Sequence, residues 1–95
     1  MNCKEEFLKI IEGYVVECVY MELKETEYNL RMGHTNEDFK RFLGMIDFEY
    51  DSGYGEQNLY GTIWFKDRTW AERGEYDGSE WWEHKEYPEI PEKLQ

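Results

Sequence analysis

The chain has 95 residues, of which 35% are charged and 18% are aromatic, and its formal net charge is −11 at pH 7. Disordered chains are poor in aromatic residues, so four Trp, eight Tyr and five Phe predict a folded protein. The negative electrostatic potential of such a chain repels nucleic acid and anionic membranes and attracts basic protein surfaces. We therefore expect a single domain over residues 1–95 that binds neither nucleic acid nor membrane directly.

Acidic residues are concentrated in the second half of the chain. Residues 1–45 carry nine acids and six bases, whereas residues 46–95 carry thirteen acids and five bases. Acidity also keeps an aromatic-rich domain soluble, so it does not by itself establish a partner. Cys3 and Cys18 form neither a metal-binding spacing nor a disulfide framework, and glutamates interrupt any signal-peptide pattern near the N-terminus. These features predict a reduced, cytoplasmic protein.

The N-terminal quarter begins with a helical pattern. Residues 4–12 place apolar side chains along one side, which predicts a short amphipathic helix that Gly13 can end. Residues 14–23 are rich in β-branched and aromatic residues, which favours a strand. Their apolar side chains also continue the helical face of the preceding segment, so one long helix remains an alternative.

A polar connection and a second helix follow. Residues 24–34 predict a connection with a short strand at 28–32. Thr35 has the character of an N-cap residue, and Asp38 stands three positions later, as in a capping box. Apolar spacing then predicts a helix over residues 36–44.

The remaining sequence predicts strands joined by short turns. Residues 46–51 alternate apolar and acidic side chains, which is typical of a half-buried strand, and Gly53 and Gly55 mark a loop after it. Further strands are expected at residues 59–66, 69–76 and 79–85, joined by turns at Asp67-Arg68 and Asp77-Gly78 and followed by an irregular tail at 88–95.

These elements together predict an α+β fold. A short N-terminal helix and a second short helix would pack on a mostly antiparallel, aromatic-rich sheet of four to five strands. If both turns contain two residues, the alternation of side chains predicts which residues share a face. The face under the helices would then carry Ile63, Phe65, Trp70, Tyr76 and Trp81, with Gly61 and Gly74 as neighbours. The other face would carry Tyr60, Trp64, Arg73, Trp82 and His84, with Glu75 opposite Glu80.

The second of these faces is the candidate binding surface. Trp, Tyr and Arg are the residue types that concentrate binding energy at protein interfaces. Arg73 is placed to stack on Trp82, a cation–π contact. The candidate binding residues are Asp47, Glu49, Asp51, Trp64, Arg73, Glu75, Asp77, Glu80, Trp82 and Glu83.

The chain carries no motif that indicates catalysis, a cofactor or a metal. Neither His34 nor His84 lies in a metal-ligand spacing, and phosphate-binding glycine loops, nucleophile elbows and Cys-x-x-Cys are absent from the sequence. Asp47, Glu49 and Asp51 would lie in a row on one strand, which predicts a solvated acidic surface, since cation sites usually need a turning loop. We expect a binding module that is not an enzyme and needs no cofactor.

One resemblance adds to this interpretation. The C-terminal half resembles a signature of small uncharacterised proteins of bacteriophage and prophage, and the upstream block at residues 47–55 is similar to theirs. The stretches that carry the resemblance are Gly61-Thr62-Ile63-Trp64, Asp67-Arg68-Thr69-Trp70, Arg73-Gly74-Glu75-Tyr76-Asp77-Gly78-Ser79-Glu80-Trp81-Trp82 and Pro88-Glu89-Ile90-Pro91. Those proteins usually have Gly where this chain has Arg68, which argues against a type I′ turn there.

The resemblance implies a phage-type accessory protein acting in the cytoplasm of a bacterial host cell. Small acidic phage proteins include inhibitors of host defence, such as anti-CRISPR proteins and DNA mimics. By analogy, the expected partner is a host protein with a basic, nucleic-acid-binding surface. Two alternatives remain: a structural or assembly module without inhibitory function, which would permit a homodimer, and a small-molecule sponge or enzyme with a deep pocket.

Overall fold

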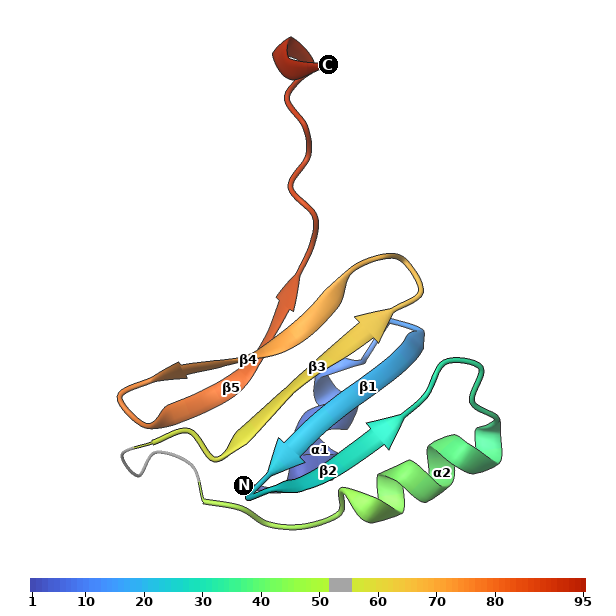
Figure 1. The fold of residues 1–95 in the computed structure, drawn as a ribbon, viewed down its shortest axis with the longest axis vertical. Helices are drawn as coiled ribbons and strands as arrows, with labels where there is room; N and C mark the ends of the chain where they lie inside the picture. The colour runs from blue at the N-terminus through green and yellow to red at the C-terminus, as the bar shows by residue number, and fades with distance from the viewer. Residues whose placement is uncertain (52–55) are drawn as a thin grey trace.

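The computed structural model describes residues 1–51 and 56–95, so the predicted loop at Gly53 and Gly55 lies outside the described residues. Five strands form one antiparallel sheet in the order β2-β1-β3-β4-β5, and two short helices pack on it (Figure 1). This confirms the predicted α+β fold. The elements are α1 (Cys3–Ile10), β1 (Val16–Leu23), β2 (Thr26–Leu30), α2 (Asn36–Met45), β3 (Leu59–Phe65), β4 (Trp70–Tyr76), β5 (Ser79–Lys85) and a short 3-10 helix, η1 (Glu92–Leu94).

Both helices begin at side-chain caps. The Asn2 side chain accepts a hydrogen bond from the backbone N–H of Glu5 and starts α1. Thr35 and Asp38 form the predicted capping box of α2, each side chain accepting from the other residue's backbone N–H. Each cap satisfies helical N–H groups that have no partner within the helix. Helix α1 ends two residues earlier than predicted, and Gly13 then takes a left-handed φ of +84°.

Residues 14–23 form a strand rather than a continuation of α1. Strand β1 runs from Val16 to Leu23, and a tight turn at Lys24-Glu25 leads into β2. Both turn residues have positive φ, +48° and +70°, as in a type I′ turn, although neither is glycine or asparagine. The sequence therefore carried no signal for this hairpin, and its second strand begins two residues before the predicted one.

The segment predicted as a strand at 46–51 is not part of the sheet. Ile46 caps the C-terminus of α2, and Glu49 makes an isolated bridge with Asn2, so the segment runs beside the N-terminus. The predicted alternation of buried and exposed side chains along this segment is nevertheless present. Ile46 and Tyr50 are buried and Phe48 is partly buried, because this segment covers one side of the core.

The β4–β5 hairpin has the predicted register. Asp77 and Gly78 have φ of +52° and +83°, which is the type I′ geometry, and Arg73 pairs with Trp82. The β3–β4 connection differs, because the Phe65 N–H donates to the Thr69 carbonyl at 2.9 Å and leaves three loop residues, 66–68, of which the last, Arg68, has φ +71°. A three-residue loop with a left-handed last residue is a common alternative to the two-residue hairpin turn.

That extra loop residue inverts the predicted faces of β4 and β5. Trp64, instead of Phe65, lies opposite Trp70, and a slip of one residue moves every side chain to the other face. Arg73 and Trp82 therefore point toward the helices with Ile63. The predicted division of faces was wrong for Trp70, Tyr76 and Trp81, which lie away from the helices. It was also wrong for Arg73, Glu75, Glu80, Trp82 and His84, which lie on the side of the helices.

The core lies between one face of the sheet and the two helices. Val19, Ile63 and Ala71 pair in a row across β1, β3 and β4 and are all buried. Phe7 of α1 packs edge-on against Phe42 of α2, with ring centroids 5.4 Å apart. In Figure 1, α1 lies behind the sheet and α2 runs along β2. The helices therefore leave the opposite face of the sheet uncovered.

Glycine serves a packing role on the buried face. A Cβ atom at Gly61 would lie 2.5 Å from the backbone oxygen of Tyr20, so only glycine allows β1 and β3 to approach so closely there. Gly74 belongs to the opposite face, since its register partner is Trp81. The prediction that Gly61 and Gly74 are neighbours on one face was therefore wrong.

Replacing Arg68 by glycine is expected to stabilise the protein by about 1 kcal/mol. A non-glycine residue in the left-handed region costs roughly this amount, partly offset by the larger unfolded-state entropy of glycine. Urea unfolding followed by circular dichroism measures the change. Lys66→Gly is the matched control, since Lys66 has no positive φ, and it should lower stability. If Arg68→Gly were as destabilising as Lys66→Gly, the loop geometry would be refuted.

The Asp38 cap should contribute stability only above acid pH. The hydrogen bond from the Thr35 backbone lowers the pKa of Asp38 in the folded protein. A depressed folded pKa means that the stabilisation is complete above the unfolded pKa, near 3.9, and is lost as pH falls through the folded pKa. Asp38→Asn should therefore lower the melting temperature at pH 7, and the difference should shrink as the pH falls below the unfolded pKa, near 3.9. A difference that did not change with pH would contradict this role.

Candidate protein-docking face

The uncovered face of the sheet, called the open face here, receives side chains from every strand. The register of the four strand pairs places them in rows. Cys18, Trp64, Trp70 and Lys85 follow one another across β1, β3, β4 and β5. The open face consists of Cys18, Tyr20, Glu22, Glu27, Asn29, Tyr60, Thr62, Trp64, Trp70, Glu72, Gly74, Tyr76, Ser79, Trp81, Glu83 and Lys85.

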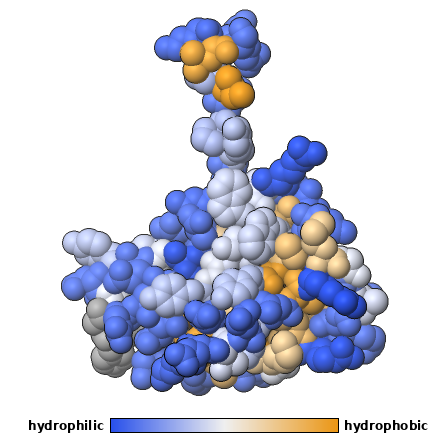
Figure 2. Space-filling view, viewed as in Figure 1, coloured by the Kyte–Doolittle hydropathy of each residue, from blue (hydrophilic) through white to orange (hydrophobic). Residues whose placement is uncertain are grey.

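Large aromatic rings on this face are exposed to solvent. Tyr60 is 50% exposed, Trp64 42%, Tyr76 77% and Trp81 37%. Figure 2 views the molecule from the same side as Figure 1, and pale aromatic rings run through the middle of this surface among polar residues. Exposed single aromatic residues are common, whereas several on one sheet face form an extended exposed apolar patch.

Trp81 is held in place against the sheet. Its indole N–H donates to Glu83 Oε1 at 2.8 Å, and its ring lies over Gly74, where a Cβ would come within 2.8 Å of the indole nitrogen. Lys85 in turn approaches Glu83 Oε2 at 3.3 Å. The hydrogen bond from Trp81, followed by Lys85, lowers the pKa of Glu83. This part of the face is therefore ordered before any partner arrives, which lowers the entropic cost of binding.

Carboxylates surround the aromatic rings and outnumber the basic residues on this face. In the five strands, all of which the structure describes, the open face carries Glu22, Glu27, Glu72 and Glu83 and a single basic residue, Lys85. Lys85 lies 3.8 Å from Glu72 as well as near Glu83, so the two other carboxylates have no base beside them on this face. The surface therefore combines an apolar centre with a negative potential.

Three of the predicted binding residues lie in the interior instead. The side chains of Arg73 and Glu80 are 1% and 0% exposed and form an ion pair at 2.9 Å. Glu80 also accepts hydrogen bonds from the backbone N–H groups of Asn58 and Leu59 at 2.8 and 2.9 Å. The predicted stacking of Arg73 on Trp82 is confirmed, at 5.1 Å from the ring centroid, but Trp82 is only 9% exposed.

Two further residues complete a buried cluster around this arginine. Arg73 donates to the Tyr50 hydroxyl at 2.8 Å and lies 3.4 Å from Glu6 Oε2, and the Tyr50 hydroxyl donates to Glu6. Burial, followed by the hydrogen bond to Glu6, raises the pKa of Tyr50. Glu6, Tyr50, Arg73, Glu80 and Trp82, called the Arg73 cluster, join α1, the 46–51 segment, β4 and β5.

The acidic residues predicted on residues 46–51 lie beside the N-terminus, away from the sheet. Asp47 accepts from the Asn2 side chain at 3.2 Å and pairs with Lys4 at 3.4 Å, and these contacts, with Asn2 first, lower its pKa. Glu49 pairs with the N-terminal ammonium at 3.1 Å. Asp51 is exposed, and its backbone oxygen accepts from the Asn58 side chain.

The last two predicted acids lie at the tip of the β4–β5 hairpin. Glu75 is exposed and accepts from the backbone N–H of Gly78 at 2.7 Å, and Asp77 occupies the turn. Glu75 lies opposite Glu80 in the register, as predicted, but Glu80 is buried. Of the ten predicted binding residues, the open face therefore brings together only Trp64 and Glu83.

Several open-face residues were not predicted as binding residues. Trp70, Tyr76 and Trp81 were predicted to face the helices, because a two-residue β3–β4 loop would place them there. The face of Tyr20 was not predicted, because its segment could be a strand or a helix. The positive φ of Arg68 depends on loop length, and the sequence does not indicate it.

The described residues include no cluster arranged to bind a metal ion, and the two histidines stack on aromatic rings. No three His, Cys, Asp or Glu side chains gather there in an arrangement that could hold a metal ion. His34 stacks beside Phe39, and His84 stacks on Tyr14. None of the helices described is long and apolar enough to cross a membrane.

Comparison with known proteins adds no relative. No family model, no curated protein and no solved structure matches this chain.

Removing the cation of the Arg73 cluster should strongly destabilise the fold. Arg73→Leu leaves the buried carboxylates of Glu6 and Glu80 uncompensated, which is expected to cost about 3–5 kcal/mol. Urea unfolding measures the loss, and Arg73→Lys should recover only part of it, since lysine lacks the planar fork of donors. Lys85→Met removes an exposed cation from the same sheet and should change stability by less than about 1 kcal/mol. Equal losses for Arg73→Leu and Lys85→Met would contradict the buried cluster.

Proposed function

We propose that this protein is a binding module whose open face docks on a basic surface of a partner protein. The observation that carries the proposal is the combination of exposed Tyr60, Trp64, Tyr76 and Trp81 with surplus carboxylates on the face of the sheet that no helix covers. Trp and Tyr dominate the energetics of protein interfaces, and complementary charge accelerates association.

The charge of the partner follows from the charge of the face. Glu22 and Glu27 have no neighbouring base on the open face, and the whole chain carries a net charge of −11. Two copies of this face would repel each other, which disfavours a homodimer formed through it. A partner that presents Lys and Arg around an apolar centre satisfies both parts of the surface.

The phage resemblance gives this docking a biological setting. A basic protein surface that normally binds nucleic acid is the natural target of an acidic module, and a host defence complex in the bacterial cytoplasm has such surfaces. Under this proposal the protein inhibits the complex by occupying that surface. The candidate contacts keep Trp64 and Glu83 and replace the residues of the Arg73 cluster by Tyr60, Tyr76, Trp81 and the adjacent glutamates.

A photocrosslinking experiment tests the docking face. The protein carries a benzoylphenylalanine either at Tyr60 on the open face or at Tyr87 in the C-terminal tail, which is 76% exposed. After addition to lysate of the bacterial host and irradiation, the Tyr60 position should capture a discrete basic protein, and the Tyr87 position should not. Raising the salt concentration should reduce the capture, since the attraction is electrostatic.

Competition with unlabelled variants makes the experiment specific. Excess wild-type protein and excess Tyr87→Ala should both abolish the crosslink at Tyr60. Trp64→Ala should compete about 30-fold less well, which corresponds to the loss of about 2 kcal/mol at a binding hot spot. If Trp64→Ala competed as well as Tyr87→Ala, or if crosslinks formed equally at both positions, the open face would not be the docking surface.

A further inference from the structure

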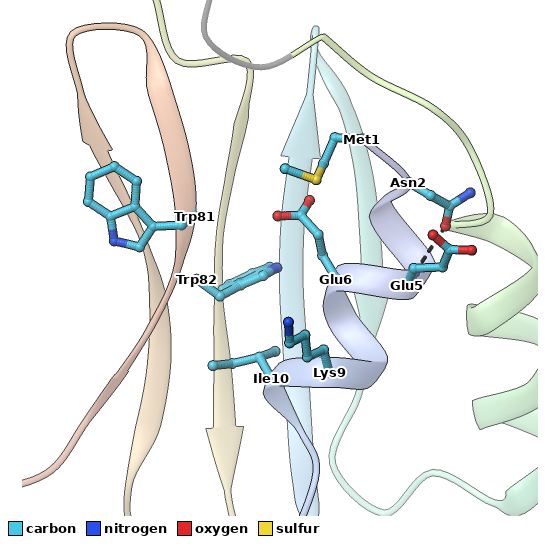
Figure 3. Close-up of a pocket in the computed structure, with 8 residues that line it drawn as sticks. All are labelled: Met1, Asn2, Glu5, Glu6, Lys9, Ile10, Trp81 and Trp82. Atoms are coloured by element: carbon cyan, nitrogen blue, oxygen red, sulfur yellow. Dashed lines mark hydrogen bonds between the residues drawn. The ribbon is translucent and has the colours of Figure 1, made fainter.

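A cleft separates helix α1 from strand β5, on the side of the sheet opposite the open face. Its volume is about 610 Å³. Glu5, Glu6, Lys9 and Ile10 line it from α1, and Trp82 lines it from β5 (Figure 3). The cleft lies beside the Arg73 cluster, which holds its two walls together through Glu6 and Trp82.

A hydrogen-bond donor in this cleft has no partner. The indole nitrogen of Trp82 is inaccessible to solvent, the residue is 9% exposed, and no acceptor bonds to this N–H among the described residues. In Figure 3 the nitrogen end of the Trp82 ring points into the space between Glu6 and Lys9. A buried N–H without an acceptor costs about 1–3 kcal/mol, so the site favours a molecule that supplies one.

Charged groups of both signs flank this donor. Lys9 is exposed and makes no ion pair within residues 1–51 and 56–95. Glu5 is exposed on the same helix, and the Glu6 carboxylate is 15% exposed at the wall of the cleft. The Trp82 ring and Ile10 supply apolar surface. The cleft therefore places hydrogen-bond donors next to carboxylates on an apolar surface.

We propose that the cleft binds an α-ammonium group adjoining a carbonyl oxygen, with an aliphatic side chain attached. The Trp82 N–H donates to the carbonyl oxygen, Glu6 holds the ammonium group, and Ile10 with the Trp82 ring contacts the side chain. A free aliphatic amino acid carries this chemistry, and so does the N-terminal residue of a peptide. Trp81 of the open face also lines the cleft, but the inference does not depend on docking at the open face, because none of the residues assigned to the ligand lies there.

Lys9 distinguishes the two sources. A free amino acid ends in a carboxylate, whose second oxygen can accept from the Lys9 ammonium while the first accepts from Trp82. The N-terminal residue of a peptide has a single carbonyl oxygen and leaves Lys9 unused. Lys9→Met should therefore weaken binding of a free amino acid about threefold and leave binding of a peptide N-terminus unchanged.

The indole resonance of Trp82 reports binding directly. In a nitrogen–proton correlation spectrum the four tryptophans give four indole signals, and Trp82→Phe identifies the one from Trp82. Titration to about 20 mM, a range suited to small weak ligands, uses L-leucine, L-leucyl-glycinamide and N-acetyl-L-leucine. L-leucine, L-leucyl-glycinamide or both should shift the Trp82 signal saturably, whereas N-acetyl-L-leucine, which lacks the ammonium, should bind at least tenfold more weakly.

Matched variants separate recognition from a general effect of charge. Glu6→Gln should weaken binding of the effective probe at least threefold, and Glu5→Gln, which removes an exposed carboxylate that turns toward Asn2, should not change it. The proposal is overturned if neither L-leucine nor L-leucyl-glycinamide moves the Trp82 signal. It is equally overturned if N-acetyl-L-leucine moves that signal at the same concentrations as L-leucine.

Discussion

The length of the loop between β3 and β4 decides which side chains this sheet buries. Three residues at 66–68 set Trp64 opposite Trp70, and the type I′ turn at Asp77-Gly78 then carries this register into β5. Because side chains alternate along a strand, a single residue in the loop determines the placement of every side chain in the hairpin. Arg73, Glu80 and Trp82 are thereby enclosed, and Trp70 and Trp81 are left on the outside.

The buried polar residues and the open face are two consequences of this one register. A buried guanidinium requires compensation, and Glu6, Tyr50 and Glu80 supply it from three different parts of the chain. The same register aligns exposed rings and glutamates over an uncovered sheet. The fold therefore keeps its strongest ion pair inside and exposes aromatic residues, which is the reverse of the usual distribution and is consistent with a surface shaped for a partner.

Much of the architecture was predictable from local sequence signals. The capping box at Thr35 and Asp38, the β-branched run of β1, the Asp-Gly turn and the β5 boundaries all have direct chemical causes in a few adjacent residues. The predicted strand at 46–51 failed because alternating burial also arises when a segment lies over the edge of a core without joining a ladder. The Lys24-Glu25 turn was not predictable, since tertiary pairing imposes a backbone geometry that neither residue favours.

The candidate site was less predictable than the fold because it depends on register. The residue types were correctly singled out, but the face of each tryptophan in β4 and β5 followed from an assumed loop length. Paramagnetic broadening of the indole N–H signals by a soluble gadolinium chelate measures those faces directly. The structure predicts strong broadening for Trp64 and Trp81 and protection for Trp82. Broadening of Trp82 with protection of Trp81 would contradict the register and, with it, the open face.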